Sequence, residues 1–111
     1  MPLRRLRRGE WREYCDRLSK ALAGGSAELE VVSLALGDRL ATQWVRLLGV
    51  TYDAKSNVME VALEGLDHMI ADPIDVCVEE TARGVVALEI TASGGEQEIV
   101  RLREPLPLPA D

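Results

Sequence analysis

The spacing of hydrophobic residues changes at Gly24-Gly25, and this change constrains the fold more than any other feature of the chain. Before the glycines, apolar residues recur every three or four positions, which is typical of a helix with one buried stripe. After them, apolar and polar residues alternate, which is typical of strands. Because the helical spacing does not return, we predict an α+β fold with one helix followed by antiparallel strands.

The predicted helix covers residues 10–22, and its stripe consists of Trp11, Tyr14, Cys15, Leu18, Ala21 and Leu22. We expect it to pack on a curved sheet of five or six strands, at about 27–36, 40–52, 58–64, 74–80, 85–92 and 97–103. Gly49 inside the long second strand predicts a bend, which could close the sheet into a small barrel. Residues 66–73 are predicted to be an irregular connection or one helical turn, because Pro73 disfavours helix at the residue before it.

A basic segment precedes an acidic body. The chain of 111 residues has a net charge of −6, but residues 1–20 carry +4 and the remainder −10. We therefore divide it into a basic arm (1–8), a single domain (9–103) and an extended proline-rich tail (104–111). The uncompensated charge is that of Arg4, Arg5, Arg7 and Arg8. We expect these arginines to be solvated or to dock on acidic groups, in the same chain or across a dimer.

The chain lacks the patterns of several functional classes. It has neither the apolar region of a signal peptide after its first arginines nor an apolar run of the roughly 20 residues that a membrane helix needs. Cys15 and Cys77 lie 62 residues apart, without zinc-site or redox-motif spacing, and no phosphate-binding loop is present. We predict a cytoplasmic protein with no membrane partner, metal, cofactor or known small-molecule ligand.

Three functions remain open. The leading hypothesis is a non-enzymatic interaction module that self-associates or binds another protein, through Arg4, Arg5, Arg7, Arg8 and the helix face of Trp11, or through an open sheet edge. The alternative is weak, salt-sensitive nucleic-acid binding by the arginines, which the acidic body opposes. The third is a hydrolase-type or metal-dependent enzyme that uses His68, the only histidine, with Asp67 or Asp72. No nucleophile or zinc ligand set accompanies it.

Several short motifs are together similar to those of a family of small bacterial proteins of unknown function. They are Arg8-Gly9-Glu10-Trp11, Leu36-Gly37-Asp38, the run Leu48 to Asp53, His68-x-Ile70-x-x-Pro73-x-x-Val76 and Leu88-Glu89-Ile90. The resemblance covers most of residues 2–103. Members of that family tend to have a second histidine and a threonine where this chain has Gly65 and Ile74, which argues against a two-histidine metal site. The resemblance implies no activity, substrate or cofactor.

Overall fold

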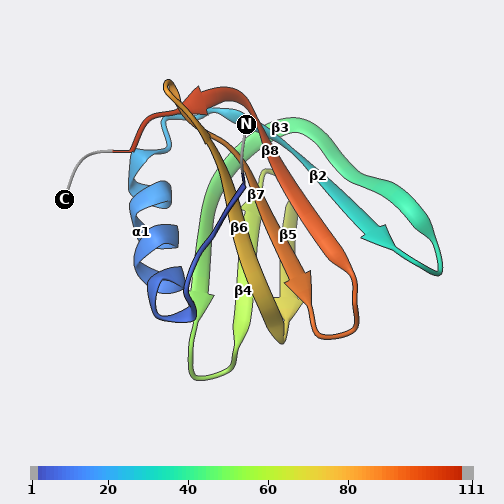
Figure 1. Cartoon of the computed structure of the whole chain (residues 1–111). Helices are drawn as coiled ribbons and strands as arrows, with labels where there is room; N and C mark the ends of the chain where they lie inside the picture. Colours follow the sequence, from blue (N-terminus) through green and yellow to red (C-terminus); the bar gives the residue numbers. More distant parts are fainter. Residues whose placement is uncertain (1–2, 109–111) are drawn as a thin grey trace.

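The computed structural model describes residues 3–108, in which one helix packs against one antiparallel sheet (Figure 1). The elements are β1 (Leu3–Arg5), the short 3-10 helix η1 (Arg8–Glu10), α1 (Trp11–Ala21), β2 (Ser26–Ser33), β3 (Gly37–Asp53), β4 (Val58–Leu63), β5 (Leu66–Ala71), β6 (Pro73–Thr81), β7 (Gly84–Ala92) and β8 (Gln97–Leu106). The strands of the sheet follow the order β1-β6-β7-β8-β2-β3-β4-β5. The predicted α+β class is therefore confirmed.

The long strand β3 joins the two halves of the sheet. Its first part, Gly37 to Arg46, pairs with β2, and its second part, Leu47 to Asp53, pairs with β4. The register shifts between Leu47 and Gly49, where the sequence predicted a bend, and Trp44 has a φ of 54° beside another shift. These irregularities let one strand turn from one half of the sheet into the other.

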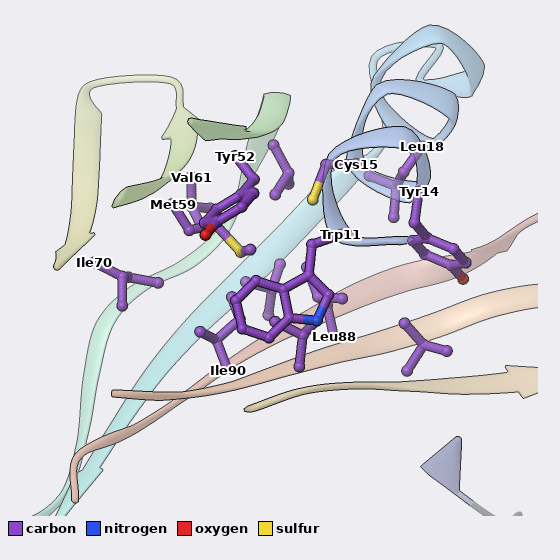
Figure 2. Close-up of a cluster of buried hydrophobic side chains, with 14 of the residues drawn as sticks. Trp11, Tyr14, Cys15, Leu18, Tyr52, Met59, Val61, Ile70, Leu88 and Ile90 are labelled. Atoms are coloured by element: carbon purple, nitrogen blue, oxygen red, sulfur yellow. The ribbon is translucent and has the colours of Figure 1, made fainter. Parts of the chain in front are cut away.

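Helix α1 lies along β3 on the inner side of the curved sheet (Figure 1). The Ser19 hydroxyl accepts a hydrogen bond from the Val50 N–H at 2.9 Å and donates one to the Val50 carbonyl at 2.7 Å. Figure 2 shows the helix side chains Trp11, Cys15 and Leu18 among side chains of both sheet halves. The rings of Trp11 and Tyr52 meet edge to face, with centroids 5.2 Å apart. The apolar stripe predicted for the helix thus forms the centre of the core.

Several predictions about the strands were wrong. The sheet has eight strands and does not close into a barrel, because its edge strands β1 and β5 do not pair with each other. Residues 66–71 form β5 and not an irregular connection, since Leu66, His68 and Ile70 alternate with exposed residues. The first hairpin turns at residues 34–36, which were predicted to belong to its first strand, and β8 continues to Leu106 and not only to residue 103. Within the segment that was predicted as a basic arm, residues Leu3–Arg5 form a strand that pairs with β6.

Candidate functional site

His68 lies on β5 and faces the interior between the two halves of the sheet. It pairs directly with the fully buried Val61 of β4, and opposed residues share one face of a sheet. Its Nε2 contacts Oε1 of Glu98, which occupies an inward position on β8. Three strands separate β5 from β8 in the sheet, so the contact crosses the interior. We call this contact the His68–Glu98 clasp.

The clasp places a carboxylate in the core. The side chain of Glu98 is 2% exposed and that of His68 is 27% exposed. A buried carboxylate needs a cation or several hydrogen-bond donors, because transfer of an unpaired charge out of water costs several kcal/mol. The hydrogen bond to Glu98 raises the pKa of His68 above its usual 6.5, and the charge of Glu96 acts in the same direction. The clasp therefore favours the protonated imidazole.

This shift makes stability depend on pH. Because the folded-state pKa of His68 is raised, its contribution is fully present below the unfolded pKa of 6.5 and is lost as the pH rises through the folded-state pKa. We expect a proton NMR titration of the one histidine of this chain to give a pKa above 6.5. In Glu98→Gln, the measured pKa should move down toward the usual value. A pKa at or below 6.5 in the unmodified protein would contradict the clasp.

The carboxylate that contacts His68 is that of Glu98, and not that of Asp67 or Asp72, the companions named from the sequence. Asp67 lies on the exposed face of β5, where its carboxyl raises the pKa of Glu60 on β4. Asp72 has a φ of 52° and serves as the turn between β5 and β6; its N–H donates to the Asn57 carbonyl at 2.9 Å. Glu98, the actual partner, is 30 residues from His68. The sequence gives one indication of this role for Glu98. It is a charged residue at a position of β8 whose side chain points inward, as that of Val100 does two residues later.

The arrangement supports a structural role for His68 better than a catalytic one. A general base must be unprotonated to accept a proton, whereas the contact with Glu98 favours the protonated form. Within residues 3–108, the structure contains no group of three or more His, Cys, Asp and Glu side chains that could hold a metal ion. The Cys15 thiol is fully buried, and burial raises its pKa to about 12, so it is not a ready nucleophile.

The N-terminal arginines that were predicted to bind a partner all have partners within the chain. On β1, the Arg4 guanidinium binds the Glu80 carboxylate at 3.1 Å, and Arg5 lies 3.4 Å from the carboxylate of Asp75. Arg7 lies 3.7 Å from the carboxylate of Glu10. The docking on acidic groups that the sequence suggested thus occurs inside one chain. These pairs are exposed, so each contributes only about 0–1 kcal/mol.

Arg8 makes the most extensive contacts of this group. Its guanidinium lies 4.4 Å from the centroid of the Trp11 ring. It also donates hydrogen bonds of 3.2 Å to the Tyr52 hydroxyl, to Oδ1 of Asn57 and to the Pro73 carbonyl. Arg8 therefore links the start of the helix to both halves of the sheet and covers one side of the core.

Trp11 was predicted to lie at a contact surface, and the structure contradicts this. The side chain is only 2% exposed, and its Nε1–H donates to the Leu6 carbonyl at 3.4 Å. The stripe that contains Trp11 faces the sheet, which already covers it. The helix face named in the leading hypothesis is consequently not available to a partner.

The other surface named in that hypothesis, an open sheet edge, is present on β3. Residues 38–45 pair with β2 on one side. The other side of β3 is occupied from Arg46 onward, because the Arg46 carbonyl accepts the Glu64 N–H at 2.8 Å and the pairing with β4 begins at Leu47. We call residues 38–45 the free edge. Apolar side chains gather on and around it. Among residues 3–108, eight large hydrophobic residues are exposed, and five of them lie between positions 34 and 48, namely Leu34, Leu36, Leu40, Trp44 and Leu48. Figure 1 shows this hairpin projecting away from α1.

A hollow accompanies the free edge. It has a volume of about 440 Å³ and is lined by Val31, Ser33, Leu36, Arg39, Leu40, Ala41 and Glu96. A larger cavity, of about 690 Å³, lies between the N-terminal segment and α1, where Arg4, Arg7 and Arg17 alternate with Glu10 and Glu13. Because cations and carboxylates nearly balance there, that cavity has little preference for a charged ligand. The free edge is the stronger candidate surface.

Comparison with known proteins places the chain in a family. The model of the family of unknown function DUF5335 matches residues 3–111. This chain belongs to DUF5335. An uncharacterized protein of Aquifex aeolicus (strain VF5) is similar to this DUF5335 chain: the two are 36% identical over 101 residues, which cover 90% of this chain and 91% of the relative. The resemblance to an uncharacterised bacterial family is thereby confirmed.

No solved structure matches this DUF5335 chain. Within residues 3–108, no helix has the length and apolar character required to cross a membrane. The relatives therefore supply a family without an activity, and arguments about function depend on the surface and the site described above.

Proposed function

We propose that this protein is a non-enzymatic interaction module that self-associates through the free edge of β3. The observation that supports the proposal most directly is the free edge itself, an unpaired strand segment with exposed apolar side chains. Unpaired N–H and C=O groups at a sheet edge are a template for another strand, and proteins usually protect them with proline, charged side chains, β-bulges or a covering element. Residues 38–45 contain no proline; their protection consists of the charges of Asp38 and Arg39 and of two register shifts.

The two other functions have less support. The arginines needed for nucleic-acid binding already contact groups of their own chain, so a polyanion would have to compete with these contacts. An enzyme would need His68 beside a substrate site with a nucleophile or a metal, and the clasp instead ties the imidazole to a buried carboxylate. Self-association requires only groups that are exposed in the folded chain.

Light scattering across a concentration series tests this proposal. We expect the measured mass to rise from the monomer value of 12.2 kDa toward twice that value at high micromolar concentration. Leu40→Lys, on the free edge, should weaken association at least about tenfold, because it places a hydrated charge where an apolar contact would be buried. A strictly monomeric unmodified protein would refute the proposal.

Leu48→Lys is the matched control. Leu40 and Leu48 are both on β3 and are exposed to 54% and 56%, but Leu48 lies in the part of β3 that pairs with β4. We expect this variant to associate as the unmodified protein does. Thermal unfolding of both variants verifies that any loss of association does not arise from a loss of fold. Equal weakening by the two substitutions would show that general surface hydrophobicity, rather than the free edge, drives the association.

A further inference from the structure

We infer that the beginning of β7 is a docking site for the C-terminal segment of this chain, and that a second copy supplies the segment by exchange. The segment runs from Pro105 to Leu108, and in this structure it docks within its own chain. The exchange goes beyond the proposed function because it uses a different surface. Figure 1 shows the end of β8 running toward α1, whereas the β2–β3 hairpin with the free edge projects away from α1.

The docking site begins at Gly84, where two stretches of backbone come very close. A Cβ at this position would lie 2.4 Å from the carbonyl carbon of Leu106 and 2.6 Å from the nitrogen of Pro107. Glycine allows this approach because it has no side chain. The next residue, Val85, pairs with Leu106 in the antiparallel ladder. The segment is therefore bound as a short strand added to the beginning of β7.

Two leucines anchor the segment. Leu106 and Leu108 are half-buried and pack against the core, whereas Pro107 between them is exposed. Leu106 lines a hollow of about 270 Å³ together with Leu22. Leu108 lines a second hollow, of about 360 Å³, together with Val85. The site thus recognises an extended segment with leucines two positions apart, as sites of strand addition recognise alternate side chains.

A linker separates the segment from the rest of β8. The pairing of β8 with β2 ends at Leu102, and its pairing with β7 is interrupted after Arg101 and resumes at Leu106. Over this interval β8 advances five residues while β7 advances two, so the linker bulges out of the ladder. Pro105 and Pro107 have no N–H to donate, which leaves the segment with few backbone hydrogen bonds. It can therefore detach while the rest of β8 stays paired.

A second copy is the occupant that fits this site, because it carries the same leucines and prolines in the same order. When two chains exchange their segments, each contact at Gly84, Val85 and the two hollows is made again between chains. Only the linker changes its conformation. Exchange of an identical element is a low-cost route to a dimer for this reason. The two-fold symmetry of such a dimer places each segment on β7 of the other copy.

Cysteine crosslinking between two different chains tests the exchange. One chain carries Val85→Cys and the other Leu106→Cys, and the two are mixed at high micromolar concentration under mild oxidation. The two positions oppose each other in the ladder, so we expect a disulfide-linked heterodimer, identified by its mass. Both chains also carry Cys77→Ala, and Cys15 is fully buried and does not compete. Leu40→Lys in both chains keeps the free edge from contributing.

Ala87→Cys mixed with Arg101→Cys is the matched control. These positions also oppose each other on β7 and β8, but Arg101 precedes the linker and does not exchange. We expect at least about tenfold less heterodimer for this pair than for the pair at 85 and 106. Equal yields for the two pairs would show that whole chains unfold and pair again. No heterodimer at 85 and 106 would show that the segment stays in its own chain. Either result overturns the inference.

A labelled peptide with the sequence of residues 103–108 gives a second readout that needs no disulfide. Leu106→Asp/Leu108→Asp in the full chain releases the chain's own segment, so this variant should bind the peptide at least about tenfold more tightly than the unmodified protein does. Adding Gly84→Ala should abolish the binding, because its Cβ takes the place of the peptide backbone. Gly65→Ala is the matched control: its φ is also positive, at 83°, but its Cβ meets open space. If the released variant is folded by circular dichroism and does not bind the peptide, the docking site is refuted, whatever the free edge does.

Discussion

Trp11→Ala is expected to lower the free energy of unfolding by about 3–5 kcal/mol, as measured by urea denaturation. The indole is 2% exposed, meets the Tyr52 ring edge to face and lies under the Arg8 guanidinium. Removing it opens a cavity between α1 and both halves of the sheet, and the surrounding strands cannot fill it because they are fixed by their pairing.

Trp44→Ala provides a control of identical chemistry. Trp44 is 38% exposed and contacts Arg103 at the surface, so we expect a loss below about 1 kcal/mol. Both variants are best compared at concentrations low enough that self-association does not contribute to the measured stability. Comparable losses for the two substitutions would show that Trp11 is not the centre of the core.

His68→Ala is expected to cost about 2–3 kcal/mol of unfolding free energy at pH 6, because it leaves the Glu98 carboxylate buried without its cation. The value lies below the largest losses reported for fully buried pairs, since His68 is partly exposed and water can reach the vacated space. Asp67→Ala, on the outer face of the same strand, should change stability by less than about 0.5 kcal/mol.

Replacing both members of the clasp separates two explanations. In His68→Met/Glu98→Leu, no charge is buried, so we expect stability near that of the unmodified protein and much above that of His68→Ala. The double variant should also lose the decline in stability that accompanies deprotonation of His68. If the double variant is as unstable as His68→Ala, the shape of the side chains, rather than the buried charge, is what the core requires.

Local patterns in the sequence predicted the helix and most strands because each depends on neighbouring residues. The stripe from Trp11 to Leu18 and the alternation of Met59, Val61 and Leu63 both appear in the structure with the expected faces inward. Strand β5 was not predicted, because the alternation before Pro73 extends over only six residues and a proline there also fits an irregular connection. Strand β1 was missed because three residues carry no periodicity, and its strand character arises from pairing with β6.

The clasp and the free edge could be predicted only in part. His68 stood out as the one histidine, but Glu98 becomes its partner through the curvature of the sheet, which brings β5 opposite β8. An open edge was expected in general terms. Its location could not be derived, because it depends on where β4 stops pairing along β3. The partners of the arginines likewise arise from tertiary contacts between distant residues.

Because β1 pairs with β6, this edge of the sheet can form only after most of the chain has been synthesised. Arg5 pairs with Cys77, which is translated 72 residues later, and this takes roughly 4–14 s at ordinary rates of 5–20 residues per second. During that interval, the arginines of β1 lack Asp75 and Glu80, and the Trp11 stripe lacks the strands that cover it. The nascent chain therefore exposes the apolar face of α1 close to arginines whose carboxylate partners have not yet been synthesised.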